Sequence, residues 1–378
     1  MDDHCVNMPT TLAISKKAGK HSGRVTRASS RSGVSYVIMT ESRHSGNTSN
    51  DGGMAGRDAS PANHGSAKAP HRERAVHGLH GVDGVVEALA SQRYVTDRSL
   101  ATALYLSLAL PKPLLLEGEA GVGKTEIAKA LSAITGAPLI RLQCYEGLDI
   151  AHAVYEWDYS RQMLHIRMLE AQAGAGGSMD ADDLFGPRFL VRRPLLQAIE
   201  ATREMPPVLL IDELDRADDE FDAFLLELLS DWQVTIPELG TIKATVPPMV
   251  IITSNRTREL HDALKRRCLY HWIEYPTVQK ELEIIAARIP DAPKPLSVQI
   301  ATFVQALRKE DLWKVPGVAE TLDWTAAMIA LGIEELKNPI VLDTLGTLLK
   351  HQEDVVRVQR DLYPRLVGEV ASGSDVRP

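Results

Sequence analysis

Four short, largely apolar segments in the middle of the chain predict β-strands. They span residues 114–117, 207–211, 249–254 and 269–273. The second segment, 207–211, is apolar at every position, which is typical of a strand in a parallel sheet covered on both faces. Helix-forming stretches precede and separate these runs at 82–89, 99–110 and 126–131. The alternation predicts an α/β fold in which helices flank a parallel sheet.

The pattern changes after this region, because helical periods follow one another from Thr277 without strand signals, as in 281–285 and 300–307. We therefore expect an α/β domain over 82–275 and a smaller all-helical domain over 276–370. Alternating stretches also predict two β-hairpins. One would join 153–159 to 163–168, and the other would join 233–236 to 241–244.

Residues 1–74 have a different composition from the rest of the chain. They are rich in Ser, Gly, His and Asn and carry 11 Lys and Arg against 6 Asp and Glu, whereas the remainder carries 31 against 44. So little apolar surface predicts a disordered basic tail. The tail could contact an acidic partner, its histidines could bind metal, or the true start could lie later, at Met54.

Composition and charge exclude several classes of protein. Mean hydropathy is -0.13, and no apolar run approaches the ~18 residues that a membrane-spanning helix needs. The three cysteines, Cys5, Cys144 and Cys268, are scattered. This spacing excludes a disulfide scaffold and a CxxC metal site and favours a cytoplasmic location. The net charge of -8 argues against a nucleic-acid-binding protein.

A glycine-rich segment follows the first apolar run and has the spacing GxxxxGKT, in the required order of strand, loop and helix. Its glycines would let backbone N–H groups converge on phosphate oxygens at a helix N-terminus. Lys124 would reach the β- and γ-phosphates of a nucleotide, and the Thr125 hydroxyl would bind Mg²⁺. The alternative is a tight turn without a ligand. The expected nucleotide contacts are Gly118, Glu119, Ala120, Gly121, Val122, Gly123, Lys124, Thr125 and Glu126.

Two acidic residues follow the second apolar run. Asp212 and Glu213 would lie at the carboxyl end of a parallel strand, where α/β sheets bind ligands. Asp212 would hold Mg²⁺, directly or through water, and Glu213 would accept a proton from the attacking water. The alternative is a solvated acidic pair in a loop.

Three further candidate residues follow the acidic pair. Asn255 ends the third apolar run and could orient the reacting water, or it could close the strand through its own turn chemistry. Arg266 and Arg267 end a helical stretch before the fourth run. They could complement the helix dipole or reach the nucleotide of a neighbouring subunit.

The order of these motifs resembles that of an AAA+ ATPase of the MoxR type. The stretches 212–242 and 263–272 are most similar to the CoxD-like branch, which is associated with maturation of a molybdenum-containing carbon monoxide dehydrogenase. The resemblance covers about residues 82–335 and implies a P-loop NTPase fold whose helical domain acts as a lid. It also implies ATP and Mg²⁺ as ligands and a partner with a von Willebrand-type domain.

The resemblance assigns a role to each candidate residue. Lys124 and Thr125 correspond to Walker A, Asp212 and Glu213 to Walker B, and Asn255 to sensor 1. Arg267 matches the arginine finger best, and Arg266 is the second choice. Because such a finger acts on a neighbouring subunit, a ring is implied, most simply a hexamer.

The chain departs from the family at sensor 2, because residues 316–324 contain no basic residue. Coupling of the lid to the γ-phosphate would therefore need a contact other than a basic side chain in this stretch. Adenine contacts are expected near Tyr94 and Val95, as in relatives. The two predicted hairpins would touch a remodelled substrate or pack only on their own subunit.

The leading hypothesis from the sequence is an ATP-hydrolysing remodelling chaperone. The alternative is a nucleic-acid-directed AAA+ motor, although the acidic core and the lack of a basic stripe argue against it. A GTP switch would need an [NT]KxD motif, which the chain lacks. A small-molecule kinase would leave the arginine pair and the helical C-terminal part unexplained, and Glu213 argues against a regulator that does not hydrolyse nucleotide.

Overall fold

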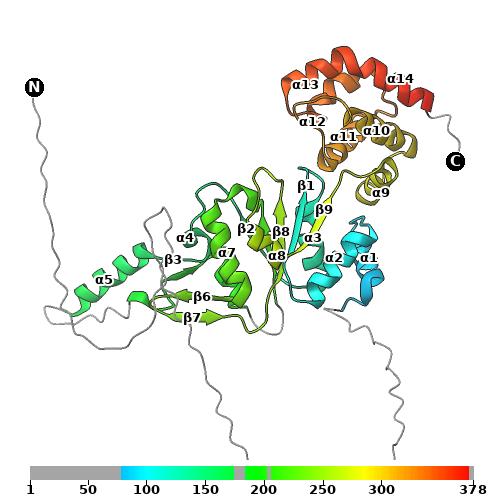
Figure 1. The fold of residues 1–378 in the computed structure, drawn as a ribbon. Helices are drawn as coiled ribbons and strands as arrows, with labels where there is room; N and C mark the ends of the chain where they lie inside the picture. The colour runs from blue at the N-terminus through cyan, green and yellow to red at the C-terminus, as the bar shows by residue number, and fades with distance from the viewer. Residues whose placement is uncertain (1–77, 174–183, 202–205, 374–378) are drawn as a thin grey trace, which may run out of the picture. The chain divides into compact units, whose positions relative to one another are not determined.

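The computed structural model describes residues 78–173, 184–201 and 206–373. All of them belong to one compact unit, Ala69–Pro378. The predicted tail, 1–74, lies outside the described residues. A five-stranded parallel sheet with the order β2-β5-β8-β1-β9 forms the centre of the first part (Figure 1). Its strands are β1 (Leu114–Gly118), β2 (Leu139–Gln143), β5 (Val208–Asp212), β8 (Met249–Ser254) and β9 (Leu269–Ile273).

The sheet forms as the apolar runs predict. Strands β1, β5 and β8 are buried at every position, as expected for strands with neighbours on both edges and helices on both faces. The register pairs Leu115 of β1 with Ile252 of β8, and Leu210 of β5 with Ile251 of β8. The carboxyl ends of these three strands therefore lie at the same edge of the sheet, where the candidate side chains follow.

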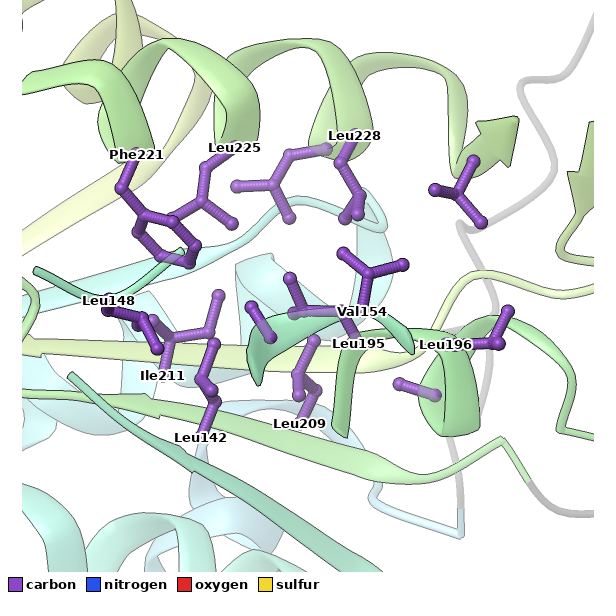
Figure 2. Close-up of a cluster of buried hydrophobic side chains, with 14 of the residues drawn as sticks. Leu142, Leu148, Val154, Leu195, Leu196, Leu209, Ile211, Phe221, Leu225 and Leu228 are labelled. Carbon is purple, nitrogen blue, oxygen red and sulfur yellow. The ribbon is translucent and has the colours of Figure 1, made fainter. Parts of the chain in front are cut away.

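Helices cover both faces of the sheet. One face packs on α1 (Gly81–Ser91), α2 (Arg98–Ala109) and α3 (Lys124–Thr135). The other face packs on α4 (Ile150–Ala153), α6 (Pro194–Ile199), α7 (Asp219–Asp231) and α8 (Asp262–Arg267). Figure 2 shows this second core, in which side chains of α7 and α6 meet Leu209 and Ile211 of β5.

Hydrogen-bonding side chains fix where several helices begin. Asp218 accepts a hydrogen bond from the backbone N–H of Phe221 at 3.0 Å at the start of α7. Asp97 accepts one from Leu100 at 2.8 Å at the start of α2. Such N-caps pair amide groups that have no partner within the helix.

One predicted hairpin is wrong. Residues 163–168 lie inside α5 (Tyr159–Ala173), and β3 (Tyr155–Trp157) pairs antiparallel with β4 (Leu190–Arg192) instead. The stretch is rich in Arg, Gln, Met and Leu, which favour helix. Its apolar side chains do not form a buried strand face, because Met163 and Leu164 are more than half exposed.

The second predicted hairpin is confirmed with a shift of one residue. Strand β6 (Gln233–Ile236) pairs antiparallel with β7 (Gly240–Lys243). Gly240, the first residue of β7 after the turn, has a φ of +84°, a conformation that glycine adopts without steric cost.

Every element described in the C-terminal part is a helix, which agrees with the predicted fold class. A core around Phe303, Trp324 and Leu345 holds its helices together. The indole N–H of Trp324 donates to Thr344 at 2.9 Å, which satisfies a buried polar group. Its α-helices are α9 (Val278–Arg288), α10 (Lys294–Leu307), α11 (Val318–Ala330), α12 (Leu345–Leu348), α13 (Gln352–Arg357) and α14 (Tyr363–Gly373). A π-helical turn, Val358–Leu362, joins the last two. No helix among the described residues is long and apolar enough to cross a membrane.

Candidate functional site

A pocket of about 430 Å³ lies at the carboxyl ends of β1, β5 and β8. In parallel α/β sheets this edge is the usual place for a ligand. The phosphate-loop segment, the end of β5 and the end of β8 all line it, together with residues from α9 and α11. The candidate residues among its lining are Ala120, Gly121, Val122, Gly123, Lys124, Thr125, Glu126, Asp212, Glu213 and Asn255.

The glycine-rich loop is shaped by its backbone. Gly121 and Gly123 have φ angles of +78° and +93°, which residues with a Cβ rarely adopt. The loop leads directly into α3, whose first residue is Lys124. Free N–H groups at a helix N-terminus and the loop before it form a cradle for an anion.

The Lys124 ammonium is folded onto this loop. It donates to the carbonyl of Gly118 at 2.8 Å and to that of Glu119 at 2.6 Å. Burial lowers the pKa of Lys124, while the nearby Asp215 and Glu119 carboxylates act in the opposite direction. Its charge is thus held at the floor of the pocket.

A hydroxyl and a carboxylate meet beside the lysine. Thr125 donates to Asp212 Oδ1 at 2.9 Å, and the Thr253 hydroxyl donates to the same oxygen at 2.6 Å. Oxygen ligands of this kind suit Mg²⁺, which usually takes one or two protein oxygens and completes its shell with water and phosphate. Within the described ranges, no group of three or more His, Cys, Asp or Glu side chains is placed to hold a metal ion. Thr125 and Asp212 lie side by side and offer two oxygens, which fits the few protein ligands that Mg²⁺ usually takes.

Two polar residues of the edge strand β2 contact the acidic pair. Arg141 donates to Asp212 Oδ2 at 2.5 Å, and the Gln143 amide donates to Glu213 Oε2 at 3.1 Å. Neither residue is predicted from the sequence, because polar residues interrupt the apolar positions of β2. The polar positions 141 and 143, two residues apart and so on one face of the strand, were the available signal.

The Glu213 backbone is strained. Its φ is +55°, unusual for a residue with a side chain. The conformation is held by a hydrogen bond from the Glu213 N–H to the Thr253 hydroxyl at 2.8 Å. The Arg216 guanidinium lies 3.2 Å from the Glu213 carboxylate. Strain of this kind gathers at functional sites, where the surroundings enforce it.

Asn255 lines the pocket, and hydrogen bonds that the sequence did not predict hold the loop that carries it. Its backbone N–H donates to Asp215 Oδ1 at 3.0 Å, and Thr257 donates to Oδ2 through its N–H and its hydroxyl at 2.9 and 2.7 Å. Burial tends to raise the pKa of Asp215, but these hydrogen bonds outweigh it and lower the pKa. A buried carboxylate thus fixes the loop that carries Asn255.

The two candidate arginines lie apart from this pocket. Arg266 and Arg267 end α8, are exposed, and are not among the residues that line it. Neither therefore acts on the pocket of its own chain in this structure. Tyr94 and Val95, by contrast, do line it.

Cations reach the pocket from α9, which the sequence analysis did not foresee. Lys280, Ile284 and Arg288 line it at a spacing of four, on one helix face. Lys280 pairs with Asp97 at 3.0 Å and Arg288 with Glu126 at 3.1 Å. The start of α11 also lines the pocket, through Val318 and Ala319, and offers no basic side chain there.

Comparisons with solved structures find RuvB from Thermotoga maritima. One structure, of a point mutant, is 15% identical with a TM-score of 0.41 and covers 79% of this chain and 86% of that chain. Another, of the Holliday junction branch migration motor, is 15% identical with a TM-score of 0.38. It covers 72% of this chain and 80% of that chain. At these values the likeness carries no argument about function. A search of curated proteins finds no match.

A comparison with protein families matches residues 113–268 to the AAA domain (dynein-related subfamily). The matched segment contains the glycine-rich loop, the acidic pair, Asn255 and both candidate arginines. It also contains every strand of the parallel sheet except β9. The family match therefore covers the segment that carries most of the candidate site residues.

Proposed function

We propose that this chain is a MoxR-type ATPase that binds Mg²⁺ and ATP in the pocket at the edge of the sheet. The observation that carries the proposal is the convergence of a buried ammonium, a hydroxyl and a carboxylate, from Lys124, Thr125 and Asp212, on one glycine-rich loop. A cationic and metal-binding site beside a helix N-terminus matches the charge of a triphosphate.

In this proposal each residue has a role in binding. The loop 118–126 would surround the phosphates, and the Lys124 ammonium would exchange its two carbonyl partners for phosphate oxygens. Thr125 and Asp212 would hold Mg²⁺, which neutralises charge on the β- and γ-phosphates. Tyr94 and Val95 would lie against the base.

Hydrolysis needs a base and a group that orients water. Glu213 would accept the proton, since its carboxylate is partly exposed and lines the pocket. Asn255 would orient the water from a backbone position fixed by Asp215. The Gln143 amide holds one oxygen of Glu213, so this contact would have to change before Glu213 can act.

We extend the proposal to a ring, most simply a hexamer. Arg267, or in second place Arg266, would enter the pocket of a neighbouring subunit, because both are exposed and lie away from their own pocket. An arginine supplied in this way raises rates in related systems by about 10³–10⁵.

For the biological role, we propose a cytoplasmic remodelling chaperone. The resemblance to the CoxD-like branch favours a molybdenum-containing carbon monoxide dehydrogenase as client, with a von Willebrand-domain protein as partner. Nucleotide-dependent capture of that partner by the purified chain tests this step. Gel-shift binding of duplex DNA at physiological salt would instead favour a nucleic-acid motor.

The nucleotide site is tested by Lys124→Ala. We expect the affinity for a fluorescent ATP analogue to fall at least about tenfold, since a buried positive charge is removed from the phosphate cradle. Lys112→Ala is the matched control, because Lys112 is exposed just before β1, at the opposite end of that strand. Equal affinity in wild type and Lys124→Ala would overturn the proposed site.

A further inference from the structure

The start of α11 contacts the phosphate loop through main-chain atoms. The N–H groups of Val318 and Ala319 both point to the carbonyl of Gly121, at 3.0 and 3.3 Å. These are amides of the first turn of a 13-residue helix, which have no partner inside the helix. The loop that would hold the phosphates and the helix that lines the pocket are thus joined without a charged side chain.

The approach leaves no room for a side chain at Gly317. A Cβ placed there would lie 2.8 Å from the Ala120 carbonyl oxygen and 2.9 Å from Gly121 Cα, both of them backbone atoms. The φ of Gly317 is -84°, which any residue adopts. Glycine is therefore required here by space and not by conformation, and an alanine would have to move α11 away from the loop.

A buried ion pair holds the turn that carries Gly317. Arg308 makes two hydrogen bonds to Glu281, at 2.7 and 2.8 Å, and their side chains are 5% and 0% exposed. The same guanidinium donates to the Pro316 carbonyl at 2.9 Å. The Thr321 hydroxyl lies 2.8 Å from Glu281 Oε1 and 3.0 Å from the Gly317 carbonyl.

This arrangement connects several elements at one point. Glu281 belongs to α9, Arg308 directly follows α10, and Thr321 belongs to α11. The Arg308 guanidinium also lies 4.9 Å from the centre of the Tyr275 ring, in the segment that joins the sheet to the helices. Because a buried pair with all its partners resists rearrangement, the turn and the helix should move as one piece.

We propose that the contact of Gly317, Val318 and Ala319 with the phosphate loop sets the position of the helical part over the nucleotide, and that Thr321 and the Arg308–Glu281 pair are its positioning residues. The inference rests on the proposed nucleotide site. It supplies the coupling for which residues 316–324 lack a basic side chain. Nucleotide on the loop and closure of α11 over it would then stabilise each other.

Gly317→Ala tests the contact, with Gly346→Ala as matched control. Gly346 lies in α12, and a Cβ there meets nothing within 4 Å. For Gly317→Ala we expect the Kd of a fluorescent ADP analogue to rise about tenfold, while the control keeps the wild-type value. An unchanged Kd in Gly317→Ala would overturn the proposal.

Amide hydrogen exchange separates this role from a general loss of structure. In Gly317→Ala the Val318 and Ala319 amides should exchange at least about tenfold faster, while amides around Trp324 keep their protection. Thr321→Val should shift the same two amides in the same direction, because it removes a hydroxyl but keeps the shape. Unchanged exchange at both amides, or loss of protection throughout the helical core, would contradict the proposal. If the wild type bound no nucleotide, the proposed function would fail, yet exchange at these amides would still report the contact.

Discussion

Asp215 shows how a single residue can organise the proposed site without lining it. Its two carboxylate oxygens accept hydrogen bonds from Asn255 and Thr257 and so hold the loop after β8 against the end of β5. An asparagine in place of Asp215 would keep one accepting oxygen and replace the other with an NH₂ group, which donates. Either Asn255 or Thr257 would then lose its acceptor on this side chain.

Asp215→Asn is therefore expected to lower the free energy of unfolding by about 1–3 kcal/mol at neutral pH. Hydrogen bonds depress the pKa of Asp215 below its ordinary 3.8, so the contribution is complete above about pH 4 and is lost as pH falls through the folded-state pKa. Denaturant unfolding at a series of pH values measures both effects. Asp231→Asn, at an exposed position, is the control. If Asp215→Asn and the wild type had the same free energy of unfolding at neutral pH, this role would be contradicted.

At the residue scale, the sequence predicted the residues with a fixed motif but not those that depend on strand register. Lys124, Thr125 and Asp212 follow from the spacing of one loop and the end of one strand. Arg141 and Gln143 reach the acidic pair only because β2 pairs with β5 so that Gln143 lies opposite Asp212. Nothing local in the sequence fixes that pairing.

At the scale of elements, the packing of α7 on the sheet positions the acidic pair. Phe221, Leu225 and Leu228 lie along one face of α7 and meet the β5 side chains (Figure 2). The Arg258 guanidinium also holds the buried Asp222 of this helix at 2.8 Å. Helix α7 follows Asp215 by a short connection, so its seating affects the network around Asn255.

Leu225→Ala should destabilise the fold by about 2–5 kcal/mol, because it leaves a cavity at a side chain with 0% exposure. Glu227→Ala on the exposed face of the same helix should change stability by less than about 0.5 kcal/mol. Thermal or denaturant unfolding compares the two. Equal effects would mean that this face of α7 is not a packed core.

The type of element could be predicted where the apolar pattern is nearly continuous. The prediction was wrong where apolar residues are exposed. The strands around Leu115, Leu210 and Ile251 are buried on both faces, so their sequence is apolar except near their carboxyl ends. In α5 the side chains of Met163 and Met168 face solvent, so their spacing does not report a buried face. The hairpin partner of β3 lies in β4, beyond the reach of a local pattern.

At the scale of the whole molecule, the proposal requires a second subunit. Within the described residues, the pocket lacks any contribution from Arg266 or Arg267, although both lie in the segment that matches the AAA domain. A closed ring would place one subunit's α8 against the next subunit's pocket. The ring and the nucleotide site are then tested together by mixing inactive variants.

Mixing Glu213→Gln with Arg267→Ala should restore ATPase activity that neither variant has alone. In a random one-to-one ring, about a quarter of the junctions combine an intact Glu213 with an intact Arg267. Steady-state phosphate release from the mixture measures the recovery. A mixture of Glu213→Gln with Arg266→Ala is the parallel experiment for the second-choice arginine. A mixture as inactive as its parts, for both arginines, would contradict a residue acting between subunits.

The most direct measurement compares nucleotide binding and phosphate release in wild type and Glu213→Gln. The account predicts that both bind an ATP analogue with Mg²⁺ equally, while the variant releases phosphate about 10²–10⁴-fold more slowly, since only the base is lost. Wild-type protein that binds no adenine nucleotide, or a variant that hydrolyses ATP at the wild-type rate, would contradict the account.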